Sequence, residues 1–147
     1  MRASEVFNRI PTLETHGTLE TEISGIVFDS RKVTAGALYI AVKGVVTDGH
    51  AFIANAVDKG ASVVVCEIFP EQLKENITYI KVKNSAKTLG QLASNFYGNP
   101  SENLQLIGIT GTNGKTSVAT LLYGIFKELG LRSALISTVE YRIGDEI

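Results

Sequence analysis

Short apolar runs recur along the first half of the chain and are separated by turn-forming residues. Residues 23–30 and 36–44 read ISGIVFDS and GALYIAVKG. Both runs are bounded by Gly, Asp or Ser, which predicts β-strands. Residues 61–67, ASVVVCE, form a continuous β-branched run, a pattern typical of a strand buried on both faces. Residues 77–82, ITYIKV, predict a further strand.

Two helical patterns accompany these strands. Asp48 is a suitable N-cap for a helix in which the apolar residues of 52–57 share one face and which ends at Gly60. A second, amphipathic helix is predicted by apolar residues at i, i+3, i+4 and i+7, namely Leu89, Leu92, Ala93 and Phe96. Gly98 and Pro100 would end this helix, and a polar linker follows.

After the linker the pattern starts again. Residues 104–110 and 132–138, LQLIGIT and RSALIST, predict two strands on either side of a helix whose apolar stripe runs through 118–129. A strand-loop-helix-strand unit of this kind is the start of a parallel sheet with a right-handed crossover. We therefore predict an α/β protein, with a complete small domain at residues 1–100 and the opening unit of a second domain at residues 101–147.

Composition narrows the class of protein. The chain has 147 residues, 44% of them hydrophobic and 20% charged, which suits one globular domain or a small domain plus part of another. A net charge of -1 and a pI near 6.1 argue against nucleic acid as the main partner. Cys66 is a single cysteine and is expected to be an inert core thiol. No apolar run has the length of a signal peptide or a membrane span, so we expect a soluble, cytoplasmic monomer without a membrane partner.

The segment GTNGKTS, at the junction between a predicted strand and a predicted helix, carries the clearest chemistry. Its two glycines permit a backbone whose N–H groups point inward around phosphates, with the helix dipole adding to the attraction. Lys115 would reach the β- and γ-phosphates and is the candidate catalytic residue, and the Thr116 hydroxyl would ligate Mg²⁺. The candidate ATP-binding residues are Gly111, Thr112, Asn113, Gly114, Lys115, Thr116 and Ser117.

This segment departs from the general phosphate-loop template in one place. The template G-x-x-x-x-G-K-[ST] has glycine where this chain has Ile109, and the nearest glycines are Gly108 and Gly111. The alternative is a glycine-rich turn with an incidental lysine. A strand before, a helix after and G-K-T at the junction favour the phosphate loop.

Three segments together resemble the Mur ligase family. ITGTNGKTS resembles the family's ATP loop, which often lacks the first glycine of the general template. Residues 28–67, from FDSR through KGVVTDGH to VVVCE, resemble the N-terminal uridine-nucleotide-binding domain shared by the MurE and MurF branches. Residues 134–147, ALISTVEYRIGDEI, are similar to the MurE continuation, whereas MurF usually has an Asn-rich segment there.

The MurE resemblance implies an ATP-dependent ligase of peptidoglycan precursor synthesis. Such a ligase joins a diamino acid, meso-diaminopimelate or lysine, to UDP-N-acetylmuramoyl-L-alanyl-D-glutamate through an acyl phosphate, with ATP and Mg²⁺ as cofactors. The uridine nucleotide would contact positions that match the family's motifs, which are Phe28, Ser30, Val45, Val46 and Thr47. A small hydroxyl such as that of Ser30 suits a hydrogen bond to uracil or phosphate.

Several alternatives stay open. One is a MurF-type ligase that adds D-Ala-D-Ala, and another is a nucleotide-binding module without catalysis. The second has force because the family's Mg²⁺-binding acid, its acceptor-amine site and its C-terminal domain would lie beyond Ile147, so this chain alone is expected to be inactive. Arg31 could bind a ligand or could pair with Asp29 in a turn, and for His50 beside Asp48 we favour a helix-start role.

Overall fold

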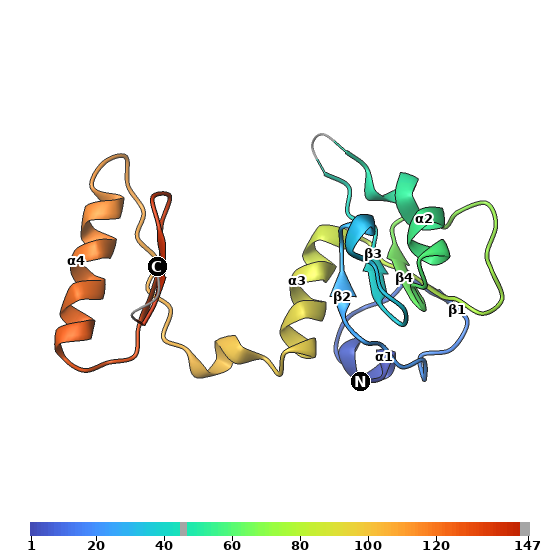
Figure 1. Ribbon diagram of the computed structural model, residues 1–147, viewed down its shortest axis with the longest axis horizontal. Coiled ribbons are helices and arrows are strands. Elements are labelled where there is room, and N and C mark those ends of the chain that lie inside the picture. The colour runs from blue at the N-terminus through green and yellow to red at the C-terminus, as the bar shows by residue number, and fades with distance from the viewer. Residues whose placement is uncertain (45–46, 145–147) are drawn as a thin grey trace. The chain divides into compact units, whose positions relative to one another are not determined.

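The computed structural model describes residues 1–44 and 47–144 and divides into two compact units, Met1–Leu104 and Gln105–Ile147 (Figure 1). None of the helices in the described part of the chain is both long enough and apolar enough to cross a membrane.

The first unit is built on a five-stranded sheet with the strand order β1-β5-β4-β3-β2. The strands are β1 (Glu14–His16), β2 (Ile26–Val27), β3 (Leu38–Ile40), β4 (Val63–Cys66) and β5 (Thr78–Lys81). Strands β2 to β5 are parallel neighbours, and β1 pairs antiparallel with β5. The apolar runs predicted the four parallel strands, but β1 is exposed throughout and has no apolar run to indicate it.

Helices cover both faces of this sheet, because successive residues of a buried strand point to opposite sides. On one face β3, β4 and β5 pack against α1 (Ala3–Val6) and α3 (Ser85–Phe96), and on the other they pack against α2 (Ile53–Asp58) (Figure 1). The first core contains Leu38, Ile40, Val63, Val65, Ile80 and Leu92. The second contains Tyr39, Val64, Cys66, Tyr79, Ile53 and Ala56. Cys66 is fully buried, as predicted, and burial raises the pKa of its thiol to about 12.

Capping residues and glycines bound the helices of the first unit, and of these the sequence predicted Asp48, Gly60 and Gly98 but not Asn84. Asp48 caps the 3₁₀ helix η2 (Gly49–Phe52), which continues into α2, so the predicted helix begins as a tighter turn. Asn84 caps α3 by accepting a hydrogen bond from the Lys87 N–H. Gly60 and Gly98 have positive φ where the chain turns away after α2 and α3. A short 3₁₀ helix, η3 (Pro100–Asn103), lies in the predicted linker.

The second unit differs from the predicted parallel unit. It contains α4 (Lys115–Glu128), β6 (Ala134–Ile136) and β7 (Tyr141–Ile143), and β6 pairs antiparallel with β7. Residues 104–110 form no strand in the described part of the chain, and Leu106 is 94% exposed. A strand forms only where a neighbouring strand completes its backbone hydrogen bonds. For β6 this neighbour is β7, because the four-residue turn between them closes with little loss of chain entropy.

Candidate functional site

The phosphate-loop candidate lies at the start of α4, as predicted. Gly114 is the N-cap residue, with φ of 78°, and Gly111 has φ of 151°. Both values favour glycine. A Cβ on Gly114 would meet no atom within 4 Å, so the requirement there is for backbone conformation and not for space. The first intrahelical bond runs from the Val118 N–H to the Gly114 carbonyl at 2.9 Å.

The Lys115 side chain folds back over this loop. Its Nζ donates to the Gly111 carbonyl at 2.6 Å and to the Thr112 carbonyl at 3.3 Å. An α-helix leaves the N–H groups of its first turn without acceptors inside the helix, and its dipole makes this end positive. The loop and Lys115 are exposed, and Thr116 is half-buried. The arrangement fits an anion such as phosphate, which would receive hydrogen bonds from the backbone and from the lysine.

The residues around the loop also fit a magnesium ion carried by a phosphate ligand. Within residues 1–44 and 47–144 there is no group of three or more His, Cys, Asp or Glu side chains that could hold a metal. Mg²⁺ keeps several waters and is commonly bound through substrate phosphates with few protein ligands. The Thr116 hydroxyl, in the first turn of α4, is the protein group that would hold it beside a nucleotide. The ion would supply neutralisation of phosphate charge.

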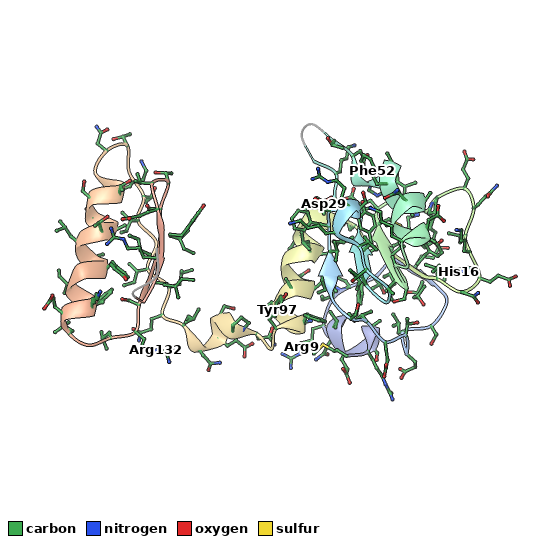
Figure 2. The ribbon with its side chains drawn as sticks, in the orientation of Figure 1. Arg9, His16, Asp29, Phe52, Tyr97 and Arg132 are labelled. Atoms are coloured by element: carbon green, nitrogen blue, oxygen red, sulfur yellow. The ribbon has the colours of Figure 1, made fainter. Side chains whose placement is uncertain are left out.

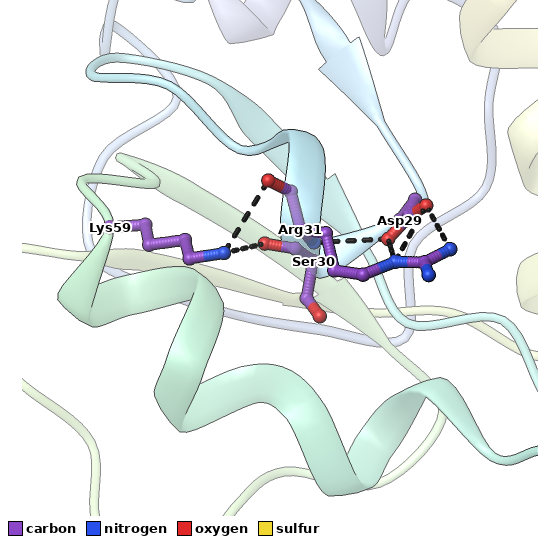
Figure 3. A network of polar contacts seen from close by, with 4 residues as sticks. All are labelled: Asp29, Ser30, Arg31 and Lys59. Carbon is purple, nitrogen blue, oxygen red and sulfur yellow. Dashed lines mark hydrogen bonds and ion pairs between the residues drawn. The ribbon is translucent and has the colours of Figure 1, made fainter.

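A tight turn follows β2 and contains the FDSR motif. The Asp29 carboxylate accepts hydrogen bonds from the Arg31 N–H at 3.0 Å, from its Nε at 2.9 Å and from its Nη2 at 2.8 Å (Figure 3). The Arg31 side chain lowers the pKa of Asp29 from 3.8 to about 2. The 3₁₀ helix η1 (Ser30–Lys32) begins here. Lys59, after α2, donates from Nζ to the Ser30 carbonyl at 3.1 Å and to the Arg31 carbonyl at 3.4 Å.

The two predicted uridine-contact residues of this turn differ in exposure. The Phe28 side chain is 63% exposed, whereas Ser30 is only 8% exposed. The ring of Phe28 is therefore available to a ligand. The contacts of Lys59 with the backbone hold the turn in place, and Lys59 has no motif that would have indicated this role.

The segment after β3 supplies the other predicted uridine contacts. Val45 and Val46 lie outside the described residues, and Thr47 is exposed. The base of the segment is closed by a bridge between Lys43 and Asp48 and by a hydrogen bond from the Gly44 N–H to the Thr47 carbonyl at 3.0 Å.

The segment after β2 and the segment after β3 lie at the same edge of the sheet, the one formed by the carboxyl ends of the strands. This follows because β2 and β3 are adjacent parallel strands. The Tyr39 side chain, in β3, is affected by a carboxylate from each of the two segments. Burial, followed by the charges of Asp29 and Asp48, raises the pKa of the Tyr39 phenol, so one carboxylate from each segment acts on the same side chain. Ligands of open α/β sheets bind at the carboxyl ends of the strands. The structure thus brings Phe28, Ser30 and Thr47 to the edge where a ligand is expected.

Comparison with known proteins matches both segments of the chain. A profile described as "Mur ligase family, catalytic domain" matches residues 22–97, and one described as "Mur ligase middle domain" matches residues 109–147. The chain belongs to the Mur ligase family. The resemblance predicted from the sequence is confirmed. In this Mur ligase chain the uridine-site candidates lie in the first matched segment and the phosphate loop lies in the second.

The curated relatives of this Mur ligase chain are considerably longer than it is. It is 49% identical over 146 residues to the "UDP-N-acetylmuramoyl-L-alanyl-D-glutamate--2,6-diaminopimelate ligase" of Phocaeicola vulgatus, covering 99% of this chain and 30% of the relative. The ligase of the same name from Cytophaga hutchinsonii is 47% identical over 148 residues, with 100% and 30% covered. The chain therefore spans 30% of the length of these relatives.

Solved structures resemble the same region. The "UDP-N-acetylmuramoylalanyl-D-glutamyl-2,6-diaminopimelate--D-alanyl-D-alanyl ligase" of Acinetobacter baumannii has a TM-score of 0.64 at 28% identity, covering 87% of this chain and 28% of that one. MurF of Thermotoga maritima in complex with ADP has a TM-score of 0.52 at 32% identity, with 74% and 24% covered. A 2,6-diaminopimelate ligase has a TM-score of 0.73 at 22% identity, with 100% and 29% covered, which supports the fold alone.

Proposed function

We propose that this chain forms the uridine-nucleotide-binding part and the start of the ATP-binding part of a MurE-type ligase. The ligase would act in the cytoplasm as a monomer and would add 2,6-diaminopimelate to UDP-N-acetylmuramoyl-L-alanyl-D-glutamate. The observation that carries the proposal is the set of relatives that bear this name, which are 49% to 38% identical over 84% to 100% of this chain. Their name favours diaminopimelate over lysine as the added amino acid.

The proposed reaction explains why the chain needs its phosphate loop. A carboxylate is a poor electrophile, and transfer of a phosphoryl group from ATP makes one of its oxygens a good leaving group. The incoming amine then attacks the carbonyl carbon and phosphate departs. Lys115 and the first-turn N–H groups of α4 would bind the phosphates and offset their negative charge during the transfer. Thr116 would hold Mg²⁺.

The first unit would hold the uridine end of the substrate. Phe28 offers an exposed aromatic face to the base. The exposed hydroxyl of Thr47 and the largely buried hydroxyl of Ser30 would offer hydrogen bonds at the same edge. We include Val45 and Val46 among the proposed contacts because of their place in the motif.

A MurF-type ligase is the alternative, supported by D-alanyl-D-alanyl ligase structures at 28% to 32% identity. The curated diaminopimelate ligases, at 49% to 38% identity, favour the MurE type.

Titration of the ¹⁵N-labelled chain tests the assignment of the two sites. UDP and UDP-N-acetylmuramoyl-dipeptide are expected to shift the amide resonances of Phe28–Arg31 and Thr47, and Mg·ATP is expected to shift those of Gly111–Ser117. A Ser30→Phe variant that keeps the dispersed amide spectrum of the folded parent should reduce the response to UDP, and Ser101→Phe, at an exposed position, serves as the control. Shifts caused by UDP at Gly111–Ser117 with none at Ser30 would contradict the proposal.

A further inference from the structure

His50 makes hydrogen bonds in two opposite directions from the segment after β3. The Asp48 Oδ1 accepts from the His50 backbone N–H at 2.9 Å and lies 2.6 Å from the ring Nδ1. On the other side of the ring, Nε2 accepts from the Glu67 backbone N–H at 2.9 Å. The His50 side chain is only 17% exposed. A helix-start role explains the first of these bonds, but it does not explain the two made by the ring.

These partners fix the protonation state of the ring. A nitrogen that accepts from a backbone N–H carries no proton, so Nε2 is unprotonated. The other nitrogen lies beside a carboxylate oxygen, which accepts and cannot donate when ionised, so Nδ1 carries the proton. His50 is therefore a neutral imidazole in the Nδ1–H form.

The chain of hydrogen bonds continues from Glu67 into α3. The Glu67 Oε1 accepts from the Ser85 N–H at 2.8 Å and from the Ser85 Oγ at 2.9 Å, and Ser85 is completely buried in the first turn of α3. In this way the end of β4 is fixed to a helix on one side and to His50 on the other.

The same histidine stands at the base of the segment that carries Thr47. The Gly49 N–H donates to the Val42 carbonyl at 2.9 Å, and the Tyr39 hydroxyl donates to the Gly49 carbonyl at 2.9 Å. These bonds hold the residue before His50 against β3. His50 adds the connection to β4, so the segment is anchored to two strands.

We propose that His50 is a positioning residue for nucleotide binding. Its neutral ring joins Asp48, which forms a bridge with Lys43, to the end of β4, and so holds Thr47 at the carboxyl ends of the strands where the ligand is expected. This inference rests on the proposed uridine site. His50 would affect nucleotide binding through Thr47 and its neighbours, without contacting the ligand itself.

Protonation of His50 would break this connection. A proton on Nε2 would face the Glu67 N–H, so that two donors would point at each other. The Asp48 carboxylate contacts the ring, the charge of Glu67 interacts with His50, and the charge of Lys43 acts on both carboxylates. Hydrogen bonds from His50 lower the pKa of Asp48, and hydrogen bonds from Ser85 lower that of Glu67. UDP affinity is therefore expected to be high at neutral pH and to fall on acidification.

The experiment uses the only other histidine as its control. The chain has two histidines, and His16 lies in β1, at the opposite edge of the sheet from β2 (Figure 2). A ¹⁵N-labelled His16→Gln chain gives an imidazole spectrum of His50 alone, and we expect the Nδ1–H form at neutral pH. In that background UDP affinity is measured by titration across the pH range in which the spectrum shows His50 to titrate.

Two substitutions then separate positioning from mere folding. His50→Leu removes both ring bonds and is expected to weaken UDP binding about tenfold, since it leaves the Glu67 N–H without its acceptor. His50→Gln keeps an acceptor for that N–H and is expected to restore most of the affinity. Neither variant should retain the acid-dependent loss of affinity.

An Nε2–H form at neutral pH would overturn the inference. The inference would also be overturned if His50→Leu bound UDP with the same affinity and the same pH dependence as the parent. That result would leave the proposed function intact. Failure of the parent chain to bind UDP would instead defeat the proposed function, and the positioning role with it. If His50→Leu does not fold, a His50→Gln chain that keeps the parent's pH profile would still contradict the inference.

Discussion

The sequence predicted where the motif that contains Asp29 and Arg31 lies, but it did not decide what Arg31 does there. From the sequence, Arg31 was equally compatible with a ligand contact and with a turn pair. In the structure its guanidinium is bound by Asp29 through Nε and Nη2 while the side chain stays 86% exposed. The turn pair is present, and the exposed part of the guanidinium remains accessible at the edge proposed for the nucleotide.

Asp29→Asn should reduce the acid sensitivity of the fold. The folded-state pKa of Asp29, about 2, lies below its ordinary value of 3.8. The ionised carboxylate therefore contributes stability above pH 3.8, and this contribution is lost as pH falls toward 2. The stability difference between the parent and Asp29→Asn should shrink over that interval, measured by urea unfolding at a series of pH values. Asp58→Asn, which removes an exposed carboxylate paired with Lys74, serves as the control. An unchanged difference at both ends of the interval would contradict the role of the pair.

His50 marks the limit of prediction at this scale. The D-G-H spacing predicted a cap, and Asp48 does cap η2. The second ring nitrogen bonds to Glu67, which lies 17 residues away in the sequence, and no local spacing indicates that contact. Contacts of this kind follow from strand order, which a single sequence does not reveal.

At the scale of elements, burial decided which strands could be predicted. Strands β3 and β4 are completely buried and have continuous apolar runs. Strand β1 is held by its hydrogen bonds to β5 alone, and its Glu-Thr-His sequence is exposed. A hydrophobic pattern indicates which residues are buried and not which strands pair, so the sequence did not predict β1 or β7. For the same reason residues 104–110 predicted a strand that has no neighbour to pair with among the described residues.

Two glycines of the first unit should respond oppositely to alanine. A Cβ on Gly49 would lie 2.7 Å from the Val42 backbone nitrogen and 2.8 Å from its carbonyl oxygen, so Gly49→Ala should cost about 1–3 kcal/mol of stability. A Cβ on Gly90, inside α3, would meet no atom within 4 Å. Gly90→Ala should therefore stabilise the chain by about 0.5–1 kcal/mol. Urea unfolding measures both, and a neutral Gly49→Ala would show that η2 does not need its close approach to β3.

At the scale of the whole molecule, the two units differ in how much core they bury. The first unit contains two core clusters. In the second unit Tyr123 and Leu135 are the buried hydrophobic side chains among the described residues, and apolar side chains are exposed on several elements, including Leu106, Leu121, Ile136 and Ile143. The Tyr123 hydroxyl donates to the Gly144 carbonyl.

Hydrogen exchange should reveal this difference directly. The amides of β3, β4 and β5 are expected to exchange only through global unfolding, whereas those of α4 exchange through local opening, because few apolar contacts oppose it. We propose on the same grounds that the first unit folds alone, so residues 1–104 should unfold at the same urea concentration as the whole chain. Strong protection of α4 would contradict its local opening. Loss of folding in the shorter chain would show that the second unit stabilises the first.

The most direct test of the central claim is to graft this chain onto longer ligases. It would replace the matching 146 residues of the Phocaeicola vulgatus 2,6-diaminopimelate ligase and, separately, the matching region of the Acinetobacter baumannii D-alanyl-D-alanyl ligase. Phosphate release and amide formation are measured for each hybrid with its own substrates. We expect activity in the first hybrid and little in the second. In the first, Lys115→Ala should lower the rate about a hundredfold or more with little change in binding of the uridine substrate. An inactive first hybrid beside an active second one would contradict the MurE assignment, and full activity of Lys115→Ala would contradict the role of the loop.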